Sequence, residues 1–323
     1  MKRKRRNSHA WVYLIWGVNI TIALCVITTG GFYLTNQNAY AANELQVETQ
    51  NPNHIQVAPP TSYFLPTLTP NPFYTPPVFE TSTPFVLAYG PHPTIIGYSL
   101  AGRPIEAYSF GTGIKEYLIV AGIHGGYEQN TIGLANEMIK YINDHPEVIP
   151  DGSRLYIIRN MNPDGEARAN GVDGRVNNNG VDLNRNFPTE NWAKDWNRDG
   201  CWTYPSTTGG TYGGSEPETR TVTSFISSRN IQAMVSYHSA ALGVFPGGVP
   251  WEADSIQLAK SLANVTGYPY PPLDTGCIYT GTLADWAVEN GVGAAVDMEL
   301  TNHKDTDFNQ NLKALVTLLN FVP

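Results

Sequence analysis

The sequence is poor in charged residues, and positive charge is scarce outside its first six positions. Only 15% of the 323 residues are charged, and the formal net charge is −8. Residues 2–6 contribute +5 to that total, so the rest of the chain carries −13. Because nucleic-acid binding depends on basic patches that neutralise phosphates, we expect no nucleic-acid partner. The hydrophobic content of 41% suits a globular protein with a sizeable core.

One long segment lacks charge altogether. Residues 11–34 are uncharged and numerous enough to span a bilayer, with the preceding basic cluster on the cytoplasmic side. The stretch "AYA" at 39–41 resembles a signal-peptidase site, so the segment is either an uncleaved anchor or a cleaved signal peptide. A buried soluble helix is a third interpretation, which the lack of a polar stripe disfavours. The first two place the rest of the chain outside the cytoplasm, secreted or attached to the membrane by residues 1–42.

Cysteine is also scarce, with three residues in the chain. Cys25 lies within the apolar segment, whereas Cys201 and Cys277 lie in the part expected outside the cytoplasm, where disulfides persist. A bridge between the latter two would stabilise the fold by about 4 kcal/mol on the chain-entropy account. The alternative is a pair of free buried thiols.

Regular structure is expected only after a spacer. Residues 43–92 are dense in Pro and Thr without a sustained period, which predicts an extended linker. Residues 93–323 form the expected folded domain, in which apolar runs typical of buried strands alternate with segments of helical period. This alternation predicts an α/β fold with a mixed, largely parallel sheet flanked by helices. The expected strands are 103–111, 116–123, 153–161, 231–238 and 293–300, and the expected helices are 130–145, 217–229, 254–267, 282–291 and 311–321.

Polar residues stand just past several apolar runs. His124, His238 and Glu299 each end one of them, and Glu128 lies close to His124. Ligands of such sheets bind beyond the carboxyl ends of the strands, where these side chains would meet. A shared Zn²⁺ would explain several of them at once, because catalytic zinc takes three His or carboxylate ligands and leaves one position open. Each residue alone is more typical of a hydrogen-bonded structural role than of a metal ligand.

A loop rich in Gly and Asn, "RVNNNGVDLNRNFP" at 175–188, carries Arg175, Asn184 and Arg185. Arg presents a fork that matches a carboxylate, so in an acidic protein this cluster suggests a pocket for an anionic substrate group. The alternative is a turn whose Arg residues pair with Asp182 or Glu190.

The segments "IHGGYE", "NMNPDG", "GVDLNRNFP", "SEPETR", "SYHS" and "MEL" occur in an order that resembles the zinc carboxypeptidases of the carboxypeptidase A type. The resemblance covers roughly residues 95–323 and is closest to the bacterial branch, which includes murein peptide amidases. It implies one Zn²⁺ held by His124, Glu128 and His238. The family spacing is His-x-x-Glu, and here one residue is added, so that Tyr127 occupies the usual Glu position. Gly125 and Gly126 can absorb the extra residue because they lack a Cβ.

The resemblance also implies the roles of the remaining site residues. Asn184 and Arg185 correspond to the pair that grips the substrate's terminal carboxylate. Arg175 corresponds to the residue that polarises the scissile carbonyl, and Glu299 to the general acid/base. Tyr279 is most similar to the mobile Tyr that closes over the substrate, with a stacking or surface Tyr as the alternative.

These residues imply an extracytoplasmic zinc metallocarboxypeptidase that cuts C-terminal peptide bonds with metal-activated water, and whose partners are peptides or muropeptides with a free carboxylate. Alternatives are a stem-peptide amidase of the same chemistry, a catalytically silent binding module on a membrane stalk, and a small-molecule deacylase. The specificity position aligns with Ala284, which is small and uncharged and so disfavours basic terminal residues.

A second metal is also a hypothesis. "DWNRDG" at 195–200 fits the start of a calcium loop, with oxygen-bearing residues at alternate positions and then Gly. Ser206 stands where such a loop has its Glu, and a polar surface turn is the alternative.

Overall fold

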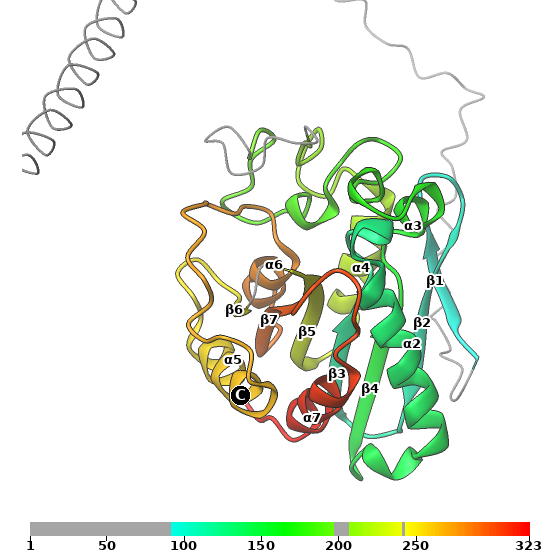
Figure 1. Cartoon of the computed structure of the whole chain (residues 1–323), viewed down its shortest axis with the longest axis vertical. Helices are drawn as coiled ribbons and strands as arrows, with labels where there is room; N and C mark the ends of the chain where they lie inside the picture. Colours follow the sequence, from blue (N-terminus) through cyan, green and yellow to red (C-terminus); the bar gives the residue numbers. More distant parts are fainter. Residues whose placement is uncertain (1–91, 197–206, 241–242) are drawn as a thin grey trace, which may run out of the picture. The chain divides into compact units, whose positions relative to one another are not determined.

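The computed structural model describes residues 92–196, 207–240 and 243–323 (Figure 1). The predicted tail, apolar segment and linker therefore lie outside the described residues, apart from residue 92. Cys201 and residues 197–200 of the expected calcium loop also lie outside them. In the part of the chain that the structure describes, no helix has both the length and the hydropathy needed to cross a membrane.

The domain is built on one seven-stranded sheet in the order β1-β2-β4-β3-β5-β7-β6. The central strands β4, β3, β5 and β7 are parallel, whereas β1, β2 and β6 join antiparallel at the edges. The sheet is thus mixed, as expected, but parallel only at its centre. Its strands are β1 (Thr94–Tyr98), β2 (Pro104–Phe110), β3 (Lys115–Val120), β4 (Ser153–Ile158), β5 (Ile231–Ser239), β6 (Gly243–Pro246) and β7 (Ala294–Leu300).

Helices cover both faces of the sheet (Figure 1). One face packs against α2 (Gln129–Asp144), α5 (Ala253–Thr266) and α7 (Phe308–Leu319). The other packs against α4 (Pro217–Ser227) and α6 (Leu283–Glu289), and the short α3 (Pro163–Arg168) follows β4. The expected helices are confirmed to within a few residues at each end.

Two apolar cores result because successive strand residues point to opposite faces. In β3, Tyr117 and Ile119 enter the core beneath α2, α5 and α7, whereas Leu118 and Val120 enter the core beneath α4 and α6. All four are at most 1% exposed. This double burial explains why the central strands are continuous apolar runs rather than alternating ones.

The elements that the sequence did not predict are short or lie at an edge. β1 contains an irregularity between Ile95 and Gly97, and β6 has four residues and ends in Pro246. Edge strands of this kind give a weak periodic signal, and Pro is tolerated there because it needs no ladder partner. The sheet was expected to be largely parallel because these edge strands were not predicted and because the sequence does not show that β2 runs antiparallel to β4.

The register of the sheet brings the expected site residues to one edge. β5 and β7 are parallel, and His238 is paired directly with Glu299. The preceding pair on the same face is Ser236 with Asp297, and before it come Met234 and Ala295, which are buried in the core beneath α4 and α6. One face of these two strands therefore changes from apolar to polar as it reaches the carboxyl edge of the sheet.

The core under α7 provides a stability test. Leu315 is 1% exposed, whereas its neighbour Val316 is 44% exposed. We expect Leu315→Ala to lower the free energy of unfolding by about 2–5 kcal/mol through the lost burial and the cavity left behind. Urea denaturation of the purified protein measures this loss, and Val316→Ala, the matched control, should change stability by less than about 0.5 kcal/mol. Equal losses for both variants would contradict the assignment of the buried face.

Candidate metal and substrate site

A tight loop after β3 positions the first two candidate ligands. His124 precedes the 3₁₀ turn η1 (Gly125–Glu128), and Gly125 has a left-handed φ of +46°. A Cβ on Gly126 would lie 1.9 Å from the carbonyl oxygen of Ala169, so no other residue fits there without a backbone shift. These two glycines allow the chain between His124 and Glu128, which is one residue longer than the family's spacing, to form a tight turn. Glu128 consequently faces His124 rather than solvent.

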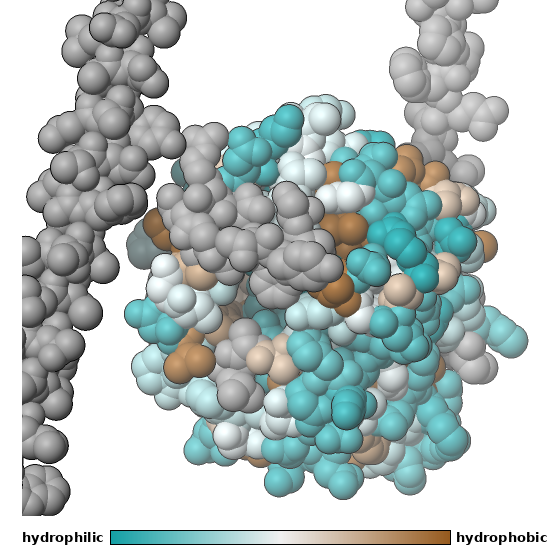
Figure 2. All heavy atoms as spheres, turned by 45° about the horizontal axis from the view of Figure 1, so that its top comes forward, coloured by the Kyte–Doolittle hydropathy of each residue, from teal (hydrophilic) through white to brown (hydrophobic). Residues whose placement is uncertain are grey.

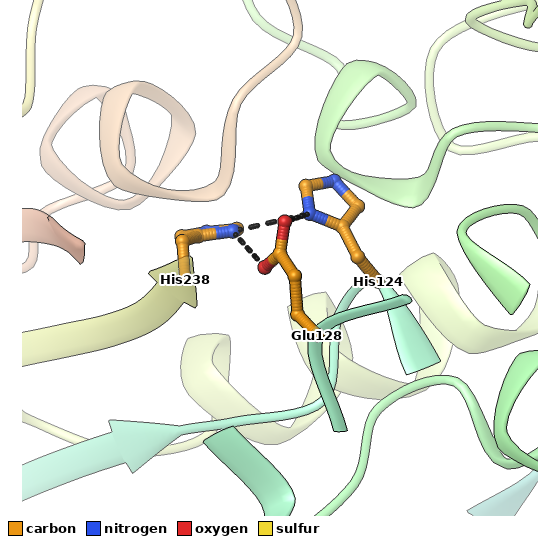
Figure 3. A group of neighbouring side chains, drawn as sticks. All are labelled: His124, Glu128 and His238. Carbon is orange, nitrogen blue, oxygen red and sulfur yellow. Dashed lines mark hydrogen bonds and ion pairs between the residues drawn. The ribbon is translucent and has the colours of Figure 1, made fainter. Parts of the chain in front are cut away.

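The three predicted ligands converge at one point (Figure 3). Nδ1 of His124 lies 2.7 Å from Oε1 of Glu128, and Nδ1 of His238 lies 3.2 Å from Oε2 of the same carboxylate. The two Nδ1 atoms are 3.3 Å apart. All three side chains are buried, and one ligand atom from each lies within 4.8 Å of the others.

This geometry fits zinc. Two imidazole nitrogens bound tetrahedrally at about 2.0–2.1 Å are separated by about 3.3 Å, the distance observed between the two Nδ1 atoms. Two His and one carboxylate are also a donor set that catalytic zinc prefers. A search of the described residues for three or more His, Cys or carboxylate side chains close enough to bind one metal finds His124, Glu128 and His238. Nothing in the described residues supports calcium.

The far nitrogens of both imidazoles have partners of their own. Nε2 of His124 lies 3.0 Å from Oδ1 of Asp182. Nε2 of His238 lies 3.0 Å from Oγ of Ser236 and 3.6 Å from Oδ1 of Asp297. Such partners fix which ring nitrogen is free to ligate, here Nδ1 in both residues.

The charges of the cluster shift one another's pKa. Burial alone would raise the pKa of Glu128, but His124 and His238 hold it below its usual value. Burial would likewise raise the pKa of Asp182, which Arg175 and His124 hold well below its normal range. Burial would lower the pKa of His238, yet Asp297 and Glu128 raise it to about 10. The carboxylates are therefore ionised and available as ligands or ligand partners at neutral pH.

Arg175 lies beside the three candidate ligands. Its Nε and Nη2 atoms contact one carboxylate oxygen of Asp182 at 2.9 and 2.8 Å. Its Nη1 atom lies 3.5 Å from Oε1 of Glu128. Arg175 therefore does pair with Asp182, as the alternative interpretation of the sequence expected. This pairing nevertheless leaves the guanidinium of Arg175 beside Glu128 and in the site.

Arg185 is packed against two aromatic rings, and its Nε–H group has no hydrogen-bond partner among the described residues. Its guanidinium carbon lies 4.5 Å from the ring centroid of Trp196 and 4.7 Å from that of Tyr279, over the face of each ring. Its Nη1 atom donates to the carbonyl oxygen of Asn184, whereas its buried Nε has no hydrogen-bond partner among the described residues. Burial lowers the pKa of Arg185. A buried cation with a free donor is suited to receive a carboxylate from a ligand.

These side chains share one cavity of about 690 Å³. Its rim is partly apolar, since the exposed side chains of Val249, Trp251, Leu273 and Ile278 border it. On the face drawn in Figure 2, apolar residues form small separate patches among hydrophilic ones. The cavity wall includes all eight predicted site residues: His124, Glu128, Arg175, Asn184, Arg185, His238, Tyr279 and Glu299.

Tyr127, the residue added to the ligand motif, lies in the cavity wall but outside the ligand group. Its ring centroid is 4.8 Å from that of His303, and the guanidinium of Arg175 lies 5.6 Å from it. Burial raises its pKa, which keeps the phenol neutral.

Other residues of the site were not predicted as functional. Asp182 stood in the quoted loop but was considered only as a partner for Arg. Asp297 could have been found from "VDMEL", in which polar residues alternate with buried ones just before Glu299. Trp196 and Asp285 carry no sequence signal of a site and are brought to the cavity by tertiary packing.

Cys277 is disulfide-bonded, whereas Cys201, its predicted partner, lies outside the described residues.

Comparison with known proteins agrees with this site. Residues 92–317 match the family described as zinc carboxypeptidase, Peptidase_M14. Murein peptide amidase A of Escherichia coli (strain K12) is 31% identical over 157 residues, which cover 47% of this chain and only 60% of that relative. Murein peptide amidase A of Vibrio campbellii is 28% identical over 244 residues, or 72% of this chain and 88% of the relative. Among solved structures, a murein-tripeptide amidase from Escherichia coli O157 shares the fold, with a TM-score of 0.55 at 24% identity over 73% of this chain and 94% of that chain.

The position of the carboxylate ligand can be tested directly. We expect Glu128→Ala to lower zinc affinity by more than about 100-fold. Loss of a residue that only hydrogen-bonds to a metal ligand typically lowers the affinity by about 10–100-fold. Tyr127→Phe should retain the wild-type affinity because the phenol is outside the ligand group. Zinc content after dialysis against a chelator of known affinity measures both. Loss of zinc from Tyr127→Phe with retention by Glu128→Ala would reverse the assignment.

Asp182 should tune zinc binding without touching the ion. Asp182→Asn keeps an acceptor for the backbone N–H of Asn184 but removes the charge beside His124 and Arg175. We expect a 10–100-fold loss of zinc affinity, measured by chelator competition. Asp173→Asn removes a charge from an exposed position of the same loop and serves as the control. Equal affinity in the two variants would show that Asp182 has no such role.

Proposed function

The chain belongs to the zinc carboxypeptidase family, a family of zinc metallopeptidases, and we propose that it hydrolyses the amide bond preceding a terminal residue with a free carboxylate. The observation that carries the proposal is the cavity itself. It places the His-Glu-His cluster, Glu299 and the unused donor of Arg185 around one space. A cluster built for a metal alone would not need the buried guanidinium.

The substrate's carboxylate is held by Arg185 and Asn184. Asn184 accepts the backbone N–H of Leu283 at 2.8 Å through Oδ1, which turns its Nδ2 donor toward His238 and the cavity. The rings of Trp196 and Tyr279 restrict the guanidinium to one plane. A preorganised fork loses little freedom when it binds a carboxylate, so only substrates that present this group in reach are well positioned.

Zinc, the metal of the family, would be held by His124, Glu128 and His238 and would supply Lewis-acid activation of water and of the scissile carbonyl. Glu299 is paired in register with His238, so its carboxylate lies where it can take the proton of the attacking water. The same group then delivers a proton to the departing amine, which restores its starting state. Arg175, oriented by Asp182, donates to the oxygen on which negative charge develops.

A peptidoglycan stem-peptide amidase is the second candidate within the same chemistry. It is favoured by the two relatives whose names describe murein peptide amidases, one of which is matched over 88% of its length. A stem peptide also ends in a free carboxylate, so the same pocket would bind it. The deacylase alternative has no comparable support.

The proposal includes a location outside the cytoplasm. It is supported by the basic cluster at 2–6 and the uncharged run at 11–34, which suit an anchor or a signal peptide, with residues 43–92 as spacer. An envelope location would give the enzyme access to peptides and muropeptides of the cell exterior.

Glu299→Gln tests the chemistry. We expect a fall in kcat of about 10²–10⁴ because the amide cannot accept the water's proton, with zinc content retained. The assay is mass spectrometry of products from C-terminal peptides and muropeptides, each with a free and an amidated terminus, with and without chelator. Only substrates with free carboxylates should be cut.

Glu147→Gln, which removes a carboxylate from the surface, is the control for this variant. Full activity of Glu299→Gln would refute its role as acid/base. Stoichiometric zinc without hydrolysis of any substrate would instead favour the catalytically silent binding module.

A further inference from the structure

We infer that His303 binds the part of the substrate that precedes the scissile bond, and that its Nε2 atom accepts a hydrogen bond from the backbone N–H of the penultimate residue. His303 lines the same cavity as Glu299, which it follows by four positions. The inference rests on the proposed hydrolase function and narrows its substrate class. The substrate must carry an acylated residue before the terminal one, as a tripeptide or an N-acyl dipeptide does.

The residues expected to hold the terminal carboxylate lie on the α6 side of the sheet. Leu283, the first residue of α6, donates its backbone N–H to Oδ1 of Asn184 at 2.8 Å. Leu183, which precedes Asn184, is buried in the core beneath α4 and α6. The terminal residue of a substrate held by Asn184 and Arg185 is therefore bound on this side of the sheet's carboxyl edge.

His303 lies on the opposite side, next to α2. Neighbouring residues of a strand point to opposite faces, so Ser239 of β5 points away from the face that His238 occupies. Its Oγ contacts Asn130 in the first turn of α2 and Nδ1 of His303, at 2.9 and 3.1 Å. The candidate ligand His238 thus lies between Asn184, 3.3 Å away, and Ser239 beside His303. A substrate that is held by its carboxylate on the α6 side and cut at the metal extends toward His303.

A chain of hydrogen bonds fixes the tautomer of His303. Nδ2 of Asn130 donates to the carbonyl oxygens of Asn302 and Asp305, at 2.6 and 2.9 Å. The Oδ1 atom of Asn130 therefore faces Ser239, whose single hydroxyl hydrogen is donated to it. The oxygen of Ser239 can then only accept from His303. The neutral imidazole consequently carries its proton on Nδ1 and presents a lone pair at Nε2.

This lone pair is left for a ligand. Within the described residues no hydrogen bond reaches Nε2 of His303, and the side chain borders the cavity. A neutral acceptor pairs with an N–H group and not with a carbonyl or a carboxylate. A peptide offers such a group in the backbone N–H of the residue before the scissile bond. A substrate with a hydrocarbon acyl group, as for a small-molecule deacylase, has none.

Tyr127 continues the wall between the reacting groups and His303. Its ring centroid lies 4.8 Å from that of His303, with the ring planes inclined by 50°. The guanidinium carbon of Arg175 lies 5.6 Å from the same centroid. The ring therefore offers an apolar surface to the penultimate residue, between the group proposed to polarise the scissile carbonyl and the acceptor at His303. This gives the residue added to the ligand motif a role in substrate binding.

The test replaces one N–H group by an oxygen atom. Acetyl-alanyl and acetyl-lactoyl derivatives of the same terminal residue, chosen as the one cleaved best, share their scissile bond and nearly their shape. The purified full chain is assayed on both with zinc. We expect kcat/KM to favour the alanyl compound by about 10-fold, because an ester oxygen facing Nε2 leaves two acceptors without a donor.

A ratio near one, with both compounds cut, would overturn the role of His303 and leave the proposed function intact. Failure to cut any peptide or muropeptide would overturn the proposed function itself.

Variants assign the effect to this residue. His303→Ala should bring the ratio of the two compounds to near one, whereas His303→Gln should retain part of it because the amide oxygen reaches the place of Nε2. His145→Ala, which removes an exposed imidazole outside the cavity wall, should keep the wild-type ratio. A wild-type ratio in His303→Ala would refute the assignment.

The tautomer is measured without any reaction. Long-range ¹H–¹⁵N NMR of the zinc-free full chain, labelled at histidine, distinguishes the protonated ring nitrogen, and His303→Gln identifies the signal. We expect the proton on Nδ1 at a pH of about 8, where free imidazole side chains are neutral. A proton on Nε2 would overturn the inference, because that atom would then donate instead of accepting.

Discussion

Mutual neutralisation of buried charges at the carboxyl edge of the sheet is the constraint on which the site depends. Glu128, His124, Asp182 and Arg175 are each at most 5% exposed, and each would be costly to bury alone. Their contacts form a continuous chain from the proposed metal ligands to Arg175. Because every member is fixed by the next, the geometry of the proposed site is part of the packing of the domain.

Much of the central architecture follows from local sequence. Runs such as 116–123 and 231–238 are apolar throughout because both faces of a central strand are buried, and this alone predicts a strand covered by helices. The polar residues that end these runs could be predicted to meet, since parallel strands share one carboxyl edge. Hence His124, His238 and Glu299 were predicted from the sequence, and the structure lines one cavity with all three.

The remaining features depend on tertiary context that no local pattern encodes. Asp285 lies in an ordinary first helical turn, and only the packing of α6 against the sheet turns it toward the cavity. Trp196 joins the site because a loop folds back over Arg185. The edge strands β1 and β6 were missed because they are short and irregular, whereas β2 was predicted as a strand but its antiparallel direction was not.

The close backbone contact beneath the ligand loop has a consequence for the substitutions that this loop can accept. Gly126 meets the carbonyl of Ala169, and a Cβ on Gly174 would lie 3.0 Å from Cα of Gly126. Neither segment has room for a side chain on the touching surfaces. The longer ligand motif therefore requires glycine both at 126 and at the facing position 174, and a side chain introduced at either position would force the opposite backbone to shift.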